Sequence, residues 1–178
     1  DAISLLYGLS VAGVLHAAGV LRDKMIRAMV EDDLDYVFTP KAVAASHLHW
    51  CTAPVSLEAL CLFSSGSATF GNIGQGNYSA ANAHLDGLAL VRRMCGTIGS
   101  SLQISAVSGA GMGASTFDQA QLDGMGAISL DEFASHLMGM LCRARATGDR
   151  THALLSKGLI EFAAAFAPPL SEMAGLSS

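Results

Sequence analysis

The chain has 178 residues, of which 51% are hydrophobic and 14% are charged, and its formal net charge at pH 7 is −5. A chain of this size and composition is expected to fold as one globular domain with a sizeable core, which excludes an intrinsically disordered protein. The negative charge and the lack of a basic stripe argue against a nucleic-acid partner.

The cysteines and the apolar runs indicate the cellular compartment of the protein. The four cysteines are Cys51, Cys61, Cys95 and Cys142. They form no Cys-x-x-Cys pair, which argues against a disulfide framework or a zinc knuckle. The apolar run from Leu9 to Leu21 is interrupted by glycine and histidine and is shorter than the roughly 20 residues of a membrane span. We expect a cytoplasmic protein without a membrane span.

The strands are predicted from short, continuous apolar runs. Val11 to Ala17 and Ala59 to Phe63 are strand-length runs that lead into small residues, and Ser101 to Val107 and Thr151 to Leu155 follow later. Continuous rather than alternating runs are typical of strands buried on both faces of a parallel sheet. Helical spacing separates the runs, so the sequence predicts an α/β fold with a doubly wound parallel sheet.

Helical spacing marks Lys24 to Phe38, Lys41 to Trp50, a helix from about Asn77, and Leu130 to Arg143. One face of the third helix carries Tyr78, Ala81, Asn82, Leu85, Leu88 and Ala89. This spacing predicts one buried face. At the end of this helix, basic side chains suit the negative end of the helix dipole, and a glycine can adopt the left-handed conformation that closes it; these residues are Arg92, Arg93 and Gly96.

Three further segments are not expected to carry catalytic residues or a metal. Ser108 to Gln121, rich in small residues, is predicted to be a mobile loop that could form a substrate lid. The acidic cluster Glu31, Asp32, Asp33 and Asp35 is predicted to be a solvated helix face. His47-x-His49-x-Cys51 suggests a metal site, but residues two apart do not share a helix face, so no metal is expected.

Four polar side chains are the best candidates for chemistry. In an open parallel sheet, ligands bind beyond the carboxyl ends of the strands, where Ser65 follows a predicted strand. Tyr78 and Asn82 share a face of the next helix, and Lys41 lies on the preceding one. An ammonium near a phenol favours the ionised form, which predicts a lowered pKa for Tyr78 and a role as proton donor. These groups are the ones that ketone reduction needs.

Several segments carry a family resemblance. They are Gly13 to Leu21 (GVLHAAGVL), Pro40-Lys41, Leu62 to Ser65 (LFSS) and Gly74 to Asp86 (GQGNYSAANAHLD). They resemble the ketoreductase domain of modular and iterative polyketide synthases, a branch of the short-chain dehydrogenase/reductase superfamily. Ordinary short-chain reductases carry Tyr-x-x-x-Lys. In this chain the tyrosine is followed by an asparagine and the lysine lies upstream, the exchanged arrangement typical of the polyketide enzymes.

The resemblance implies a Rossmann-like fold and NADPH-dependent reduction of a β-ketoacyl chain held on an acyl carrier protein, among neighbouring synthase domains. Tyr78 would protonate the developing alkoxide, and Ser65 would hydrogen-bond the carbonyl oxygen. Lys41 would hold the nicotinamide ribose and tune Tyr78, while Asn82 would support the lysine and its proton relay. These roles are forms of electrostatic preorganisation.

The resemblance also implies a cofactor turn. Ala17, Ala18 and Gly19 match the turn whose backbone lies against the cofactor, where a large side chain would block the approach. Lys41 and Tyr78 would complete this cofactor-binding set.

Stereochemical markers imply the configuration of the product. Asp23 keeps the last residue of the Leu-Asp-Asp signature of B-type reductases, and Phe70 stands where A-type enzymes carry a tryptophan. A B-type enzyme that makes a D-configured hydroxyl is therefore expected. Arg22 replaces the middle aspartate, and Ala80 stands where many B-type enzymes have proline.

Two departures define the remaining alternatives. The family's Trp-Gly after the third strand is replaced by Ala106-Val107, and no Gly-x-Gly-x-x-Gly turn occurs. We expect residues 1–166 to be the catalytic C-terminal part of a ketoreductase domain whose N-terminal cofactor-binding strands lie upstream, with residues 167–178 as a linker. A non-catalytic, degenerate module of a megasynthase and a stand-alone reductase of small ketones or fatty-acyl intermediates are the alternatives.

Overall fold

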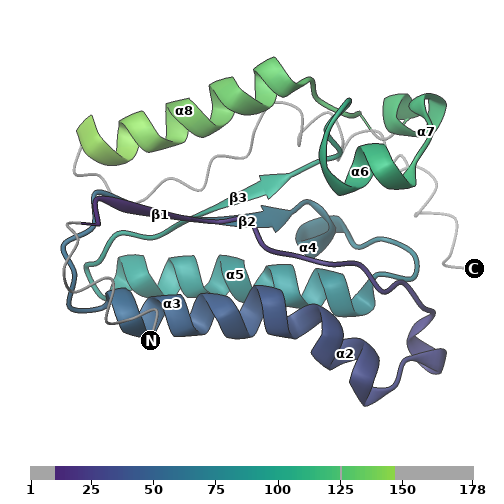
Figure 1. The fold of residues 1–178 in the computed structure, drawn as a ribbon, viewed down its shortest axis with the longest axis horizontal. Helices are drawn as coiled ribbons and strands as arrows, with labels where there is room; N and C mark the ends of the chain where they lie inside the picture. The colour runs from purple at the N-terminus through teal and green to yellow at the C-terminus, as the bar shows by residue number, and fades with distance from the viewer. Residues whose placement is uncertain (1–10, 125, 147–178) are drawn as a thin grey trace, which may run out of the picture.

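The computed structural model describes residues 11–124 and 126–146. Three parallel strands form one sheet in the order β1-β2-β3 (Figure 1). They are β1 (Gly13–His16), β2 (Ala59–Ser65) and β3 (Ser100–Ile104). The first strand pairs with the second from Gly13 opposite Ala59, and the second with the third from Cys61 opposite Ser100. The predicted fourth strand and the predicted linker lie outside the described residues.

Helices cover both faces of this sheet, as a doubly wound fold requires. They are η1 (Ile26–Ala28), α2 (Glu31–Phe38), η2 (Thr39–Val43), α3 (Ala44–Thr52), α4 (Ser67–Phe70), α5 (Gly76–Met94), α6 (Gly111–Thr116), α7 (Gln119–Gly124) and α8 (Leu130–Ala146). Helices α3 and α5 lie on one face and α8 on the other (Figure 1). The predicted α/β fold is confirmed.

Strand β2 supplies both halves of the core, because successive side chains of a strand point to opposite faces. Leu60 and Leu62, at 1% and 0% exposure, belong to the cluster with Leu85 of α5. Cys61 and Phe63 belong to the cluster that includes Met140 and Phe133 of α8, where the two phenyl rings meet edge to face with centroids 5.8 Å apart. Two covered faces explain why the strand is continuously apolar.

The segment before α2 differs from the prediction. A helix was expected from Lys24, but α2 begins at Glu31 and only a 3-10 turn precedes it. Lys24 instead donates its backbone amide to Gly74 O at 2.8 Å and forms an isolated parallel bridge with Gln75. This distant partner takes the hydrogen bond that a helix would have used, so a tertiary contact overrides local spacing.

The segment after β3 also differs from the prediction. The expected loop over Ser108 to Gln121 contains helix α6 and the start of α7. Asp118 and Gln121 form a reciprocal capping box, in which the Gln121 amide donates to Asp118 Oδ1 at 2.8 Å and the Asp118 amide donates to Gln121 Oε1 at 3.0 Å. The cap starts α7, so the prediction of a segment without packed elements is wrong.

Helix α5 follows the prediction closely. Tyr78, Ala81, Asn82, Leu85 and Ala89 are buried along one face. Gly96 just beyond the helix has a φ of 75°, the left-handed conformation predicted for it. Within the described part of the chain, no helix is long and apolar enough to cross a membrane.

Candidate active site

The candidate residues converge at the carboxyl ends of β1 and β2, where an open parallel sheet binds its ligands. A pocket of about 780 Å³ opens there. Polar and small residues on one side of it come from the segment after β1 and from η2, β2 and α5; they are Ala17, Gly19, Lys41, Ser65 and Tyr78. This volume lies in the range of small-molecule sites.

Lys41 is placed by a widened turn between α2 and α3. Pro40 lacks an amide hydrogen, so the α-helical ladder is interrupted, and residues Thr39–Val43 form a π turn. His16 at the end of β1 holds this turn, with its Nε2 3.0 Å from Lys41 O. Burial lowers the pKa of His16, which keeps the ring neutral. This hydrogen bond gives His16 a structural role.

The Lys41 ammonium lies between β2 and the tyrosine. Its Nζ donates to Phe63 O at 2.9 Å and lies 5.3 Å from the centroid of the Tyr78 ring. The side chain is only 3% exposed, and burial lowers the pKa of Lys41 from 10.5 to about 8, while the Asp86 carboxylate acts in the opposite direction. At neutral pH the lysine is therefore still mostly protonated.

Tyr78 lies in the first turn of α5, and its burial corrects one expectation. The pKa of Tyr78 is raised above its ordinary value because burial disfavours the phenolate, and this outweighs hydrogen bonding toward Asn82 and Ser65. The predicted lowering by Lys41 is wrong in this structure. A phenol that keeps its proton at neutral pH remains able to donate it to a stronger base.

Asn82 and Ser65 flank the tyrosine on two sides. Asn82 is fully buried, and its Nδ2 donates to Tyr78 O at 2.9 Å. Its Oδ1 is buried and has no hydrogen-bond partner among the described residues. Ser65 Oγ accepts the amide of Ser67 at 3.2 Å, which fixes the hydroxyl at the pocket wall. The orphaned Asn82 oxygen can accept a hydrogen bond from a water.

The turn at Ala17 and Gly19 fits the flat end of a nicotinamide cofactor. Both residues line the pocket, and Ala18 between them is exposed. A Cβ atom at Gly19 would lie 2.7 Å from Lys41 Cε, so only a glycine lets the backbone approach the lysine this closely. A small backbone surface beside an ammonium and a phenol suits a ribose and a carboxamide ring.

The remaining predicted markers lie at the rim. Asp23 does not line the pocket, but its Oδ2 accepts Gln75 Nε2 at 2.8 Å, and Gln75 does line it. Phe70 lines the pocket directly. Among the described residues, no group of three or more His, Cys, Asp or Glu side chains is arranged to hold a metal ion.

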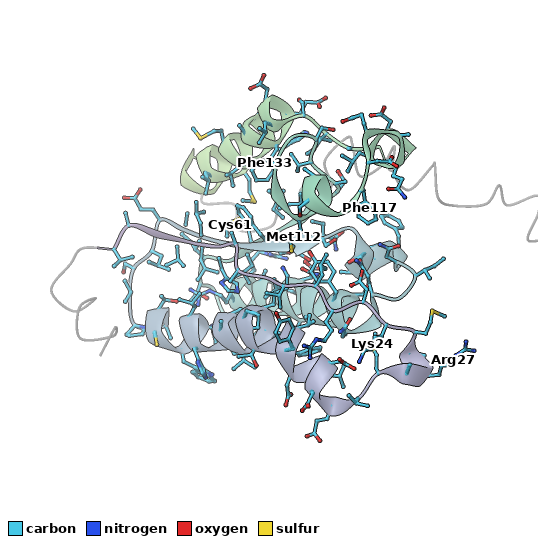
Figure 2. All side chains as sticks on the ribbon, turned by 45° about the vertical axis from the view of Figure 1, so that its right-hand side comes forward. Lys24, Arg27, Cys61, Met112, Phe117 and Phe133 are labelled. Atoms are coloured by element: carbon cyan, nitrogen blue, oxygen red, sulfur yellow. The ribbon has the colours of Figure 1, made fainter. Side chains whose placement is uncertain are left out.

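The other side of the pocket is apolar and was only partly anticipated. Met112, Phe117 and Phe133 line it from the α6–α8 region (Figure 2). Ala106 and Val107, which the resemblance sets against the family's Trp-Gly, also line the pocket. Sequence reasoning assigned Met112 and Phe117 to a lid but missed Phe133 and Gln75. The helix from Leu130 that carries Phe133 was predicted, and the capping box of Ser129 with Glu132 fixes its start, but local spacing does not show that this helix faces the pocket.

Comparisons with known proteins agree on one family. A family model described as KR domain matches residues 4–109. The chain is 50% identical over 92 residues to polyketide synthase GfsA of Streptomyces halstedii, a match that covers 52% of this chain and 1% of that protein.

Solved structures give the same result. The first ketoreductase of the tylosin PKS is similar with a TM-score of 0.72 and 35% identity, over 80% of this chain and 32% of that one. A structure of A-type ketoreductases from a modular polyketide synthase is similar with a TM-score of 0.72 and 32% identity, over 92% of this chain and 40% of that one. The fold is Rossmann-like, and the chain spans less than half the length of these relatives.

Proposed function

The chain belongs to the KR domain family of polyketide synthases, and from this premise we propose that it reduces a β-ketoacyl chain on an acyl carrier protein to the β-hydroxyacyl product. KR domains are oxidoreductases that reduce β-keto groups. The proposal is supported by the clustering of four residues: Ser65, Tyr78 and Lys41 line the pocket, and Asn82 lies behind them, bonded to Tyr78 O. NADPH, when bound, supplies the hydride.

The substrate carbonyl is held by hydrogen bonds from the pocket wall. Ser65 Oγ, fixed by the Ser67 amide, donates its proton toward the carbonyl oxygen and stabilises the negative charge that develops there. Tyr78 then donates its phenolic proton to the same oxygen. The raised pKa of Tyr78 keeps that proton in place until an alkoxide, which is a much stronger base, forms.

Lys41 and Asn82 help to return a proton to Tyr78 after the reduction. The Lys41 ammonium stabilises the tyrosinate left behind across the 5.3 Å that separates it from the ring centroid. With a pKa of about 8, Lys41 can itself lose a proton near neutral pH. The free Asn82 Oδ1 accepts from a water in this relay. Ala17, Gly19, Lys41 and Tyr78 would hold the nicotinamide end of the cofactor.

The finer properties follow from the resemblance and stay proposals. They are NADPH as the cofactor, a carrier protein and neighbouring synthase domains as partners, a B-type product indicated by Asp23 and Phe70, and a cytoplasmic location. The chain contains no Gly-x-Gly-x-x-Gly turn of the kind that holds the pyrophosphate end of such a cofactor.

A non-catalytic role in a synthase is the alternative. One observation favours it: Ala106 and Val107 line the pocket at the position where the family carries Trp-Gly, so contacts at the nicotinamide end are reduced. The four candidate residues argue against it, because a site released from catalysis is free to lose them.

Product analysis separates the two functions. A complete ketoreductase domain that contains this chain is incubated with NADPH and a β-ketoacyl thioester, free or on a carrier protein, and the product is analysed by mass and on a chiral column. A β-hydroxyacyl product in the D configuration supports the proposal, and an L product contradicts only the B-type assignment. Recovery of unchanged substrate from folded protein supports the non-catalytic alternative.

A further inference from the structure

The segment that follows β1 is joined to the start of α5 by backbone and side-chain hydrogen bonds. The Lys24 amide donates to Gly74 O at 2.8 Å, and Gln75 Nε2 donates to Asp23 Oδ2 at 2.8 Å. Leu21 and Gln75 both line the pocket. The joined segments therefore form one wall of the pocket, and the second of them leads directly into the turn that carries Tyr78.

The buried carboxylate of Asp33 binds the segment after β1 that forms part of this wall. Asp33 on α2 is 2% exposed, which corrects its assignment to a solvated face. Its Oδ1 and Oδ2 accept Lys24 Nζ at 2.9 and 2.7 Å, its Oδ1 lies 3.7 Å from an Arg22 nitrogen, and its Oδ2 accepts the Val30 amide at 3.1 Å. The hydrogen bond from Lys24 lowers the pKa of Asp33, so the carboxylate stays ionised at neutral pH. Figure 2 labels Lys24 on this segment.

A buried amide connects the same groups to the tyrosine. Asn77 is 1% exposed, and its Nδ2 donates to Arg22 O at 2.9 Å and to Asp33 O at 3.0 Å. Its Oδ1 accepts the backbone amide of Tyr78 at 2.8 Å. One side chain thus bonds to the segment after β1, to α2 and to the residue that carries the phenol, with both of its donors and its oxygen engaged.

We propose that Asn77 and Asp33 form a positioning hub that fixes Tyr78 relative to the pocket wall made by Leu21 and Gln75, and thereby fixes which face of the ketone is reduced. The proposal rests on the proposed reduction at Tyr78. Neither residue lines the pocket, so each acts through others. A polar hub that is fully buried and satisfied allows only one arrangement of the segments it joins.

The main variant is Asn77→Asp, which keeps the side chain's size and the oxygen that accepts the Tyr78 amide. It removes both donated hydrogen bonds and places an oxygen against the carbonyls of Arg22 and Asp33. We expect the Lys24 amide to exchange with deuterated solvent at least about tenfold faster, because the wall opens locally. We also expect kcat to fall about 10- to 100-fold with little change in KM, because the proton donor is displaced.

A stereochemical readout separates positioning from simple stability. The minor hydroxy diastereomer should increase at least about threefold in Asn77→Asp, since the wall and the phenol no longer share a fixed geometry. A merely structural residue would lower the folded fraction, while the molecules that remain folded would give the original ratio. Asp33→Asn should show the same changes at smaller size, because it keeps one oxygen that can accept from Lys24 or from the Val30 amide.

Asp32→Asn is the matched control, because Asp32 is the exposed neighbour of Asp33 and should leave amide exchange, kcat and product ratio unchanged. If Asn77→Asp does not fold, Lys24→Gln is used as the test variant. The Lys24 side chain is half-exposed and not needed for the core, so the variant should fold, and its backbone amide at residue 24 should still exchange faster with deuterated solvent. Unchanged amide exchange in the folded variants, or an unchanged product ratio beside normal turnover, would overturn the hub. An unvaried protein without turnover would contradict the proposed function alone, and amide exchange would still test the hub.

Discussion

Replacing Gly19 by alanine should separate activity from stability. The new Cβ would lie 2.7 Å from Lys41 Cε and 3.4 Å from its Nζ. The first distance is about 0.8 Å inside the roughly 3.5 Å at which two carbons normally touch. The lysine end is flexible, so it should move by about that amount and lose its 2.9 Å bond to Phe63 O.

Such a displacement of a positioned group costs up to about 100-fold in turnover, so Gly19→Ala should lower kcat by about 10- to 100-fold. Its free energy of unfolding should stay within about 1 kcal/mol of the unvaried protein, since alanine restricts the unfolded chain. NADPH oxidation and thermal unfolding are measured on the same samples. Gly87→Ala is the control, because no atom lies within 4 Å of a Cβ there, and both readouts should hold or improve. Full turnover in Gly19→Ala would refute the reasoning.

Two further predictions concern charge. The pKa of Lys41 is about 8 in the folded protein and 10.5 in the unfolded chain, so kcat should decline as the pH rises through about 8. The free energy of unfolding should increase between pH 8 and 10.5, because the unfolded chain binds more protons there. Chemical denaturation at several pH values measures this increase, and Lys41→Met should abolish it. Arg92→Ala should lower the free energy of unfolding by about 2–4 kcal/mol, because it removes a side chain that is only 2% exposed, together with its hydrogen bonds to Ile98 O and Thr52 Oγ1. Arg93 is half-buried, and Arg93→Ala should cost under about 1 kcal/mol. Equal losses would contradict this burial argument.

The parts of the fold that depend on periodicity could be predicted from the sequence. The continuous apolar run of β2 and the single buried face of α5 fixed the strand, the helix and the shared face of Tyr78 and Asn82. The arrangement of Lys41 near them followed from the order of elements in a parallel sheet. These features are set by residues close together in the chain or by general topology.

The parts that depend on distant partners could not be predicted. Asp33 sits in an acidic run, and nothing local shows that Lys24 neutralises it. Arg92 suits a helix end, but its burial against His49 and Ile98 comes from the packing of α3 on α5. The pKa of Tyr78 depends on how deeply it is buried, which spacing alone does not give. The start of α7 is different, because its capping box was readable.

Turnover of Tyr78→Phe beside Tyr36→Phe tests the proposed mechanism most directly. Each variant loses one hydroxyl and keeps its ring, but Tyr78 is 8% exposed in the pocket wall and Tyr36 is 49% exposed on α2. In a complete ketoreductase domain with NADPH and a β-ketoacyl thioester, Tyr78→Phe should reduce kcat by about 100-fold or more, and Tyr36→Phe should leave it unchanged. Equal turnover of both variants and the unvaried protein would contradict Tyr78 as the proton donor.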